Sequence, residues 1–123
     1  MIGYTGNIEK LTLTNEFFRH VLYTGKYAQL VVMTLQLGEE IVMEVHGSVD
    51  QFFRIEQGKA KIIMNGEETV IGNGEVAIVP AGTQHNVVNV GGELLKLYTI
   101  YSPPNHPDGT IHKTKAEAMA AGD

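Results

Sequence analysis

The 123-residue sequence predicts a small all-β protein, a β-sandwich or β-barrel in which short strands alternate with tight turns. Glycine-containing turns recur at short intervals, and the segments between them are rich in Val, Ile, Phe, Tyr and Thr. Fourteen glycines in a chain of this length agree with so many turns. No alternation of strands with long helical segments is present, which argues against a βα architecture.

The expected elements follow in chain order. The segment LTLTNEFF (11–18) alternates apolar and polar residues and is expected to be an N-terminal strand. His20 follows it and is expected on the surface or at a subunit contact. Further strands are expected at 28–37, 51–56, 60–64, 75–80 and 94–101.

The C-terminal part changes character. SPPNHPDG (102–109) contains three prolines, which prevent a regular strand and indicate an irregular loop. KTKAEAMAA (113–121) is rich in Ala, Lys and Glu and predicts a short C-terminal helix. No linker, repeat or low-complexity stretch divides the chain, so residues 1–123 are expected to form one domain ending in this loop and helix (102–121).

Composition excludes several classes of function. The net charge of −5 and the isoelectric point near 5.5 argue against nucleic acid or an anionic membrane as a partner. The chain has no cysteine, which excludes disulfides, thiolate metal ligands and a cysteine nucleophile. The N-terminus lacks the apolar run of a signal peptide, and no stretch approaches the ~18 apolar residues of a membrane-spanning helix. We therefore expect a cytoplasmic protein.

The segment IVMEVH (41–46) places two polar side chains within a hydrophobic strand pattern. Residues two apart share a face of a strand, so Glu44 and His46 lie on one face and an apolar set on the other. Either Glu44 and His46 simply face water, or they face the interior for a chemical purpose. In the second case Ile41, Met43 and Val45 need a cover, which the 11–18 segment or a second subunit would supply, and a homodimer is expected.

A second segment favours a chemical role. Residues 74–89 read G-x5-P-x-G-x2-H-x3-N, with His85 at the histidine position. This spacing resembles the second sequence motif of the cupin family at every fixed position. The first cupin motif, G-x5-H-x-H-x4-E-x6-G, fits the frame from Gly38 to Gly58, with His46 at its second histidine. Glu44 stands at the first histidine position and Gln51 at the glutamate position. The core of the resemblance is residues 38–89.

The resemblance implies an antiparallel double-stranded β-helix, or jelly-roll barrel, with a divalent metal at its mouth. Carried over residue by residue, it implies the metal ligands Glu44, His46, Gln51 and His85. Two imidazoles, a carboxylate and an amide oxygen suit Mn²⁺, Fe²⁺, Co²⁺, Ni²⁺ or Zn²⁺. Phosphomannose isomerases, which are also cupins, use a similar Gln, His, Glu and His set. The alternative is a cupin barrel whose metal site has been lost.

Three further residues are candidates for the pocket. Phe53 shares a strand face with Gln51, and Tyr101 is expected to point inward if Lys96 points outward. Phe53 is then a pocket wall or a plain core residue. His106, in the proline-rich loop, is a candidate general acid or base if the loop covers the metal mouth, and otherwise a solvated loop residue.

Three functions are compatible with these residues. The first is a metal-dependent isomerase or epimerase, related to mannose-6-phosphate isomerase, acting on a small carbohydrate or a hydroxy or keto acid. Arg54 lies on the face opposite Gln51, which argues against a phosphorylated substrate. The second is an iron-dependent dioxygenase, because two histidines and one carboxylate resemble the facial triad of those enzymes. The third is a non-catalytic module that binds a small molecule.

Overall fold

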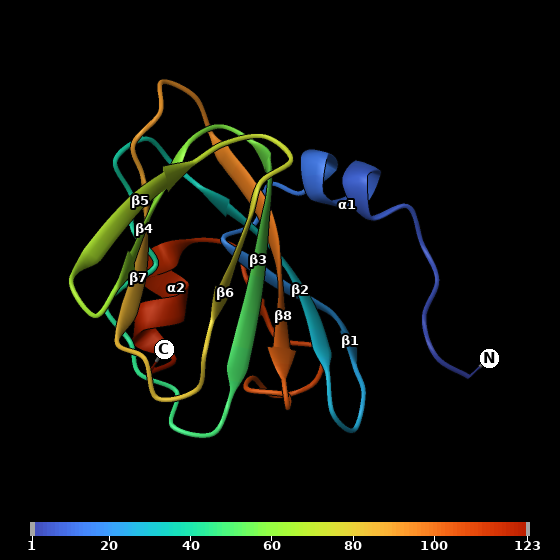
Figure 1. The fold of residues 1–123 in the computed structure, drawn as a ribbon. Helices are drawn as coiled ribbons and strands as arrows, with labels where there is room; N and C mark the ends of the chain where they lie inside the picture. The colour runs from blue at the N-terminus through green and yellow to red at the C-terminus, as the bar shows by residue number, and fades with distance from the viewer. Residues whose placement is uncertain (1, 123) are drawn as a thin grey trace.

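The computed structural model describes residues 2–122 as two β-sheets facing each other, with a short helix near each end of the chain (Figure 1). The fold is all-β with a short C-terminal helix, as predicted. In chain order the elements are α1 (Ile8–Thr14), β1 (Arg19–Thr24), β2 (Gln29–Leu35), β3 (Asp50–Gln57), β4 (Ala60–Met64), β5 (Glu67–Ile71), β6 (Val76–Val79), β7 (His85–Asn89), β8 (Leu95–Ser102), β9 (Ile111–His112) and α2 (Lys115–Ala120).

The strands form an antiparallel jelly roll. The larger sheet has six strands in the order β6-β3-β8-β2-β1-β9, and the smaller has three in the order β5-β4-β7. The paired strands within both sheets run antiparallel. Two isolated bridges, Glu40 with Val88 and Glu44 with His85, attach the segment that follows β2 to the free edge of β7. The smaller sheet is thereby extended by the segment that carries the first cupin motif.

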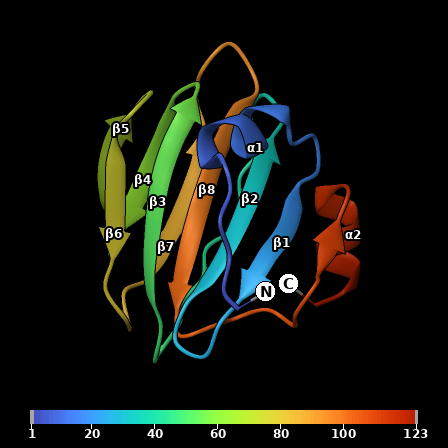
Figure 2. The same ribbon diagram turned by 90° about the vertical axis from the view of Figure 1, so that its right-hand side faces the viewer.

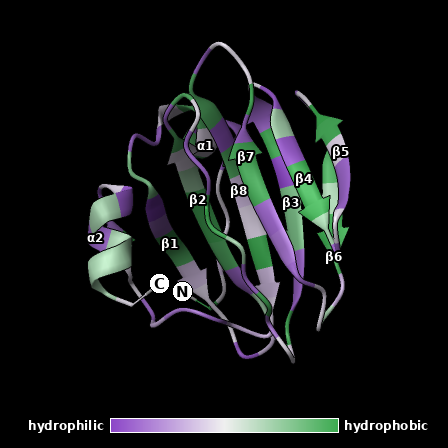
Figure 3. Cartoon of the chain, turned by 90° about the vertical axis from the view of Figure 1, so that its left-hand side faces the viewer, coloured by the Kyte–Doolittle hydropathy of each residue, from purple (hydrophilic) through white to green (hydrophobic). Residues whose placement is uncertain are grey.

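The core lies between the inner faces of the two sheets. Strands such as β3 and β8 bury every second side chain, as a strand with one face on the core must do. Figure 3 shows hydrophobic and hydrophilic residues following one another along β3, β7 and β8. The largest fully buried apolar side chains are those of Phe53, Met33, Leu35, Ile55, Ile62, Leu95 and Leu97.

The N-terminal strand prediction is wrong, because the segment from Ile8 to Thr14 forms helix α1. Asn7 caps the helix by accepting a hydrogen bond from the Lys10 backbone N–H at 3.1 Å. The hydroxyls of Thr12 and Thr14 donate back to the carbonyls four residues earlier, which makes threonine compatible with a helix here. Figure 2 shows α1 lying across the outer face of the six-stranded sheet. No helix between residues 2 and 122 is long and apolar enough to cross a membrane.

The predicted apolar face of Ile41, Met43 and Val45 is also partly wrong. Ile41 is buried in the core, whereas Met43 is 44% exposed and Val45 is 55% exposed. The strand alternation breaks at Val42, whose φ of 141° is rare for a residue with a side chain. The Asn86 side-chain oxygen accepts the Val42 N–H at 2.9 Å and stabilises this conformation. The segment therefore turns Ile41 inward instead of presenting three apolar residues outward.

Candidate metal centre

The four candidate ligands come from three segments that meet at one end of the barrel. Gln51 lies near the start of β3 and His85 begins β7. Glu44 pairs with His85 through two backbone hydrogen bonds of 2.8 and 2.9 Å, which brings the 41–46 segment beside β7. The turn between β6 and β7 is closed by Gly82, which has a φ of +81° and donates its N–H to the His46 carbonyl oxygen at 2.9 Å. The motif glycine thus joins the two histidine-bearing segments.

His85 and Gln51 lie side by side in the interior of the barrel. The Gln51 Nε2 donates to the Thr99 hydroxyl oxygen at 3.0 Å, so the amide oxygen Oε1 lies toward His85 Nε2, 3.2 Å away. The other ring nitrogen of His85, Nδ1, lies 3.0 Å from the Thr83 carbonyl oxygen. Each ring nitrogen of His85 thus faces an oxygen that accepts, and the tautomer decides which of the two carries the hydrogen. With the hydrogen on Nδ1, the lone pair of Nε2 and the amide oxygen Oε1 would both be available to a cation beside them.

His46 and Glu44 form a second pair of side chains that could bind a metal ion. The His46 Nε2 lies 3.6 Å from the Glu44 Oε2. Among the described residues this buried nitrogen has no hydrogen-bond partner. The rings of His46 and His85 lie 5.3 Å apart between centroids. A buried nitrogen without a hydrogen bond is unfavourable in a protein interior, and a metal ion would satisfy it.

The donor atoms fit a divalent ion by type and by spacing within each pair. Two ligands about 2.0–2.2 Å from one ion lie about 3.0–3.5 Å apart. The separations of 3.2 Å in one pair and 3.6 Å in the other are close to that range. Within residues 2–122, however, no three His, Asp or Glu side chains already converge as a metal site. Simultaneous binding by all four residues would require the two pairs to move closer together.

The environment of His46 favours its neutral, metal-binding form. Burial lowers the pKa of His46 below its ordinary value, and the charges of His85 and Arg19 lower it further. Arg19 is buried in β1, where its Nη1 lies 3.3 Å from the Nδ1 of His112. A neutral imidazole is the form that can donate a lone pair to a metal.

We expect the free energy of unfolding of the metal-free chain to fall as the pH drops below about 6.5. In the unfolded chain His46 takes up a proton near its ordinary pKa of 6.5, whereas the lowered pKa keeps it neutral in the folded chain. Between these two pKa values the unfolded state holds more protons, so acid favours unfolding. The His46→Gln variant should lack this part of the pH dependence. Urea unfolding with EDTA at several pH values tests this, and equal pH dependence in both proteins would contradict it.

Phe53 and Tyr101 lie beside the two histidines, where a pocket wall was expected. The Phe53 ring is 6.5 Å from the His85 ring, and the Tyr101 ring is 6.0 Å from the His46 ring and nearly perpendicular to it. Both side chains are buried on the inner face of the larger sheet. Lys96 projects from the opposite face of β8, so the predicted inward direction of Tyr101 is confirmed.

His106 lies against Tyr101. Its Nε2 is 3.2 Å from the Tyr101 hydroxyl, and the two rings meet edge to face with centroids 5.1 Å apart. His106 is buried, so the interpretation as a solvated loop residue does not hold. The proline-rich loop therefore turns back to the end of the barrel that carries the candidate ligands.

Sequence reasoning missed three polar residues of this interior. Gln29 is buried in β2 opposite Tyr101, Arg19 is buried in β1, and His112 in β9 pairs with Arg19. The sequence of β2 contained a signal for Gln29, which is a polar residue at an inward position. Gln29 is two residues from the buried Val31 and therefore shares its face of the strand. Contact between Arg19 and His112 joins residues far apart in the chain, and no local pattern indicates it.

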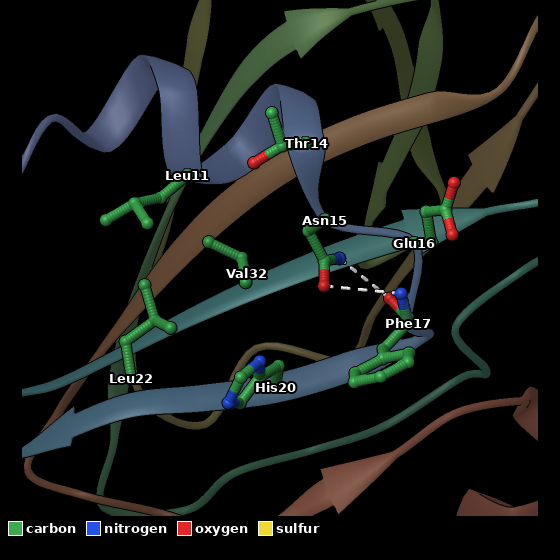
Figure 4. A pocket seen from close by; sticks show the side chains of 8 residues that line it. All are labelled: Leu11, Thr14, Asn15, Glu16, Phe17, His20, Leu22 and Val32. Atoms are coloured by element: carbon green, nitrogen blue, oxygen red, sulfur yellow. Dashed lines mark hydrogen bonds between the residues drawn. The ribbon is translucent and has the colours of Figure 1, made fainter.

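A separate hollow lies on the outer surface and contains none of the candidate ligands. Figure 4 shows it between α1 and β1, with His20 and Phe17 on one side and Leu11 on the other. Its volume is about 290 Å³. The Asn15 side chain closes the turn beside it by hydrogen bonds to both the carbonyl oxygen and the N–H of Phe17. His20 thus lies on the outer surface, as expected, and away from the barrel interior.

The two facing antiparallel sheets, with His46 and His85 of the two motifs at one end, place the chain in the double-stranded β-helix class. Residues 31–101 match the family model of the cupin domain. The chain is 50% identical to the uncharacterized protein YrkC of Bacillus subtilis, over 95% of this chain and 66% of that protein. It is 39% identical to protein L612 of Acanthamoeba polyphaga mimivirus, over 97% of this chain and 77% of the viral protein. The chain belongs to the cupin family.

A solved structure agrees with this assignment. The crystal structure of BH2720 from Bacillus halodurans superimposes with a TM-score of 0.93 at 44% sequence identity. The match covers 95% of this chain and 93% of BH2720. The chain spans just under two thirds of the length of YrkC, so the likeness to that relative concerns only part of it.

Proposed function

We propose that this cupin binds a divalent metal ion through Glu44, His46, Gln51 and His85 and acts on a small oxygen-rich molecule. The observation that carries the proposal is that the Nε2 of His85 and the amide oxygen of Gln51, both on buried side chains, lie 3.2 Å apart. The buried Nε2 of His46, which has no hydrogen bond within the described chain, adds a third donor. The Glu44 carboxylate would supply the negative charge that partly neutralises the ion.

The proposed substrate is a small carbohydrate or a hydroxy or keto acid, and the proposed reaction is isomerisation or epimerisation. A bound divalent ion polarises a carbonyl group and stabilises the negative charge of an enolate. Adjacent carbonyl and hydroxyl oxygens are suitable for binding to such an ion. The similarity of the ligand types to those of phosphomannose isomerase supports the same class. Arg54 pairs with Glu56 at 3.0 Å on the opposite face of β3, which leaves it directed away from Gln51 and argues against a phosphorylated substrate.

The side chains around the donors have separate proposed roles. His106 accepts or donates the proton that moves between carbons, and the Tyr101 hydroxyl at 3.2 Å holds its ring or relays that proton. Phe53 gives the pocket an apolar wall beside His85 and restricts water. In this arrangement the proton-transfer group is distinct from the ligands, as enolisation at a metal requires.

The second candidate function is iron-dependent dioxygenation. His46, His85 and Glu44 are two imidazoles and one carboxylate, the ligand types of non-haem iron oxygenases. In that case Gln51 would be a hydrogen-bonding neighbour of His85 and would leave the metal. A non-catalytic module that binds a small molecule is the third candidate.

Two assays on the metal-reconstituted chain separate these functions. Exchange of carbon-bound hydrogen with D₂O, followed by proton NMR on dihydroxyacetone, hydroxypyruvate and mannose, tests enolisation. Oxygen uptake by the Fe²⁺-loaded chain tests dioxygenation. We expect exchange without oxygen uptake. Binding of these probes without exchange or oxygen uptake would instead support the binding module.

We also propose that the chain forms a homodimer, with the interface on the outer face of the six-stranded sheet. One cross-strand row there is apolar over four strands, formed by Ile78, Phe52, Ile100 and Leu30. Ile78 is 60% exposed, and an apolar surface hollow of about 450 Å³ adjoins Leu30 and Ile100. Phe52, Ile100 and Leu30 are half-buried, so the row is a partly exposed apolar strip, and such surface is typical of subunit contacts.

The Ile78→Glu variant is expected to be monomeric at concentrations where the wild-type chain is dimeric. An unpaired carboxylate in the interface should weaken association by about 10²-fold or more. Val70 is the matched control, because it is similarly exposed but lies in β5 of the other sheet. Size-exclusion chromatography with light scattering measures the masses. A monomeric wild-type chain at micromolar concentration, or equal dissociation in Ile78→Glu and Val70→Glu, would contradict this interface.

A further inference from the structure

Gln29 holds the loop that carries His106. It is fully buried in β2, and its backbone lies opposite Tyr101 in the neighbouring strand β8. The Oε1 of Gln29 accepts the backbone N–H groups of Asn105 and His106, both at 3.0 Å. Its Nε2 donates to the His106 carbonyl oxygen at 2.8 Å and to the Thr24 hydroxyl oxygen at 2.9 Å. These contacts use both donors and both acceptor sites of the amide.

The hydrogen bonds of Gln29 act directly on His106. The amide binds the N–H and the carbonyl oxygen of this one residue, so the backbone at His106 is held on both sides. A backbone fixed in this way restricts the directions that its side chain can take. The imidazole then lies with Nε2 at 3.2 Å from the Tyr101 hydroxyl. Tyr101 in turn contacts the ring of His46, a candidate metal ligand.

The remainder of the loop has its own attachments. The Thr110 hydroxyl donates to the Pro107 carbonyl oxygen at 2.6 Å. The Val21 N–H of β1 donates to the Thr110 carbonyl oxygen at 2.9 Å. These bonds fasten the loop where it returns to the sheet, several residues beyond His106. The contacts of Gln29 are therefore concentrated on the part of the loop that aims the imidazole.

We propose that Gln29 is a positioning residue, which holds His106 in the orientation needed for proton transfer at the mouth of the barrel. The proposal rests on the proposed function, because it assigns His106 the role of general acid or base. Glutamine suits the task, since one side chain must both accept two N–H groups and donate to a carbonyl oxygen. Gln29 would not touch the substrate or the metal, and it would act through His106 alone.

The first test is the state of the His106 ring in Gln29→Met, which keeps the length of the side chain but removes its hydrogen bonds. Nitrogen-15 NMR of the histidine rings should show one fixed tautomer of His106 in the wild-type chain and averaged signals in the variant. Gln57→Met is the matched control. Gln57 also donates to a backbone carbonyl oxygen, that of Leu94 at 3.1 Å, but it lies at the end of β3 opposite to Gln51 and makes this bond away from His106. Unchanged His106 signals in Gln29→Met would overturn the proposal.

A second variant covers the case in which Gln29→Met does not fold. Thr24→Val removes only the hydroxyl that orients the Gln29 amide and leaves the other three bonds possible. It should shift the His106 signals in the same direction by a smaller amount. Identical signals in Thr24→Val and the wild type, with Gln29→Met unfolded, would likewise overturn the proposal.

The third test uses exchange of hydroxypyruvate hydrogens with D₂O and a double-mutant cycle. Gln29→Met should lower the exchange rate at saturating hydroxypyruvate with the metal content unchanged. In Gln29→Met with His106→Gln the rate should be no lower than in His106→Gln alone, because both changes remove the same function. Additive losses would mean that Gln29 acts elsewhere. No exchange by the wild-type chain would reject the enolisation reaction, and the NMR comparison would still decide the positioning role.

Discussion

The His85→Ala variant is expected to bind Ni²⁺ or Zn²⁺ more weakly than the wild-type chain, by about 10²-fold or more. Loss of a residue that only orients a metal ligand already lowers metal affinity by about 10–100-fold, and loss of the ligand itself should cost at least as much. His85 supplies one of two imidazoles, and its Nε2 is also the atom that faces the Gln51 amide oxygen. Its removal therefore leaves the Gln51 amide oxygen without the neighbouring ligand of its pair. Isothermal titration of each ion into the metal-free chain measures the affinity.

His20→Ala is the matched control for this experiment. It also removes one imidazole, but His20 lies on the outer surface beside Phe17 and away from the barrel interior. Its affinity should equal that of the wild-type chain. Equal affinity in His85→Ala and His20→Ala would mean that the ion binds somewhere else.

The Glu44 carboxylate and the Gln51 amide should contribute differently to the metal affinity of the site. Glu44 is the one anionic residue of the candidate set, so Glu44→Gln should weaken binding more than Gln51→Ala does. A neutral amide oxygen is the weaker of the two ligands for these ions. The reverse order would place the Glu44 carboxylate outside the coordination sphere.

His106→Gln is expected to lower the rate of hydrogen exchange in the proposed substrates by about 10²-fold or more, the usual effect of losing a general acid or base. His106 lies 3.2 Å from the Tyr101 hydroxyl and belongs to none of the ligand pairs, so the metal content should not change. His46→Ala should lose both the metal and the exchange activity. Metal analysis and proton NMR on the same samples separate the two effects.

His20→Gln provides the matched control for turnover, as His20→Ala does for binding. An unchanged rate in His106→Gln would remove His106 from the reaction and leave it a structural role beside Tyr101. Loss of metal in His106→Gln would instead show that the loop stabilises the ligand pairs.

The spacing of the two motifs predicted most of the turns and strands that carry the candidate ligands. A glycine at 82 and a histidine at 85 describe a turn followed by a strand, and the structure has this turn, with Gly82 at positive φ. Alternation along β3 correctly predicted that Phe53 shares a face with Gln51, and alternation along β8 correctly predicted that Tyr101 lies opposite to Lys96. These predictions succeeded because they depend on local backbone geometry.

The two failures have different causes, one local to its segment and one from a distant strand. LTLT has the alternation of a strand, but capping by Asn7 and back-bonding by the threonine hydroxyls stabilise a helix instead. Ile41 turns inward because the backbone at Val42 departs from strand geometry, and a side chain from β7 stabilises that departure. A contact from a distant strand cannot be read from the alternation of the segment itself.

The hydrogen bonds between Gln29 and the His106 backbone are a third feature that the sequence did not predict. Gln29 and His106 are distant in sequence, and neither residue type at its position indicates the other. Gln29 was nevertheless visible as a polar residue at an inward position of a hydrophobic strand, as Gln51 was. Buried polar side chains require partners, so such positions predict an interaction even where the partner is unknown.

Anomalous X-ray diffraction from crystals of the wild-type chain loaded with Zn²⁺ or Ni²⁺ tests the central claim most directly. We predict one ion at the mouth of the barrel, about 2.0–2.2 Å from the Nε2 atoms of His46 and His85. The Gln51 and Glu44 oxygens should complete the protein ligands. An ion bound elsewhere, or no anomalous peak between His46 and His85 at saturating metal, would contradict it.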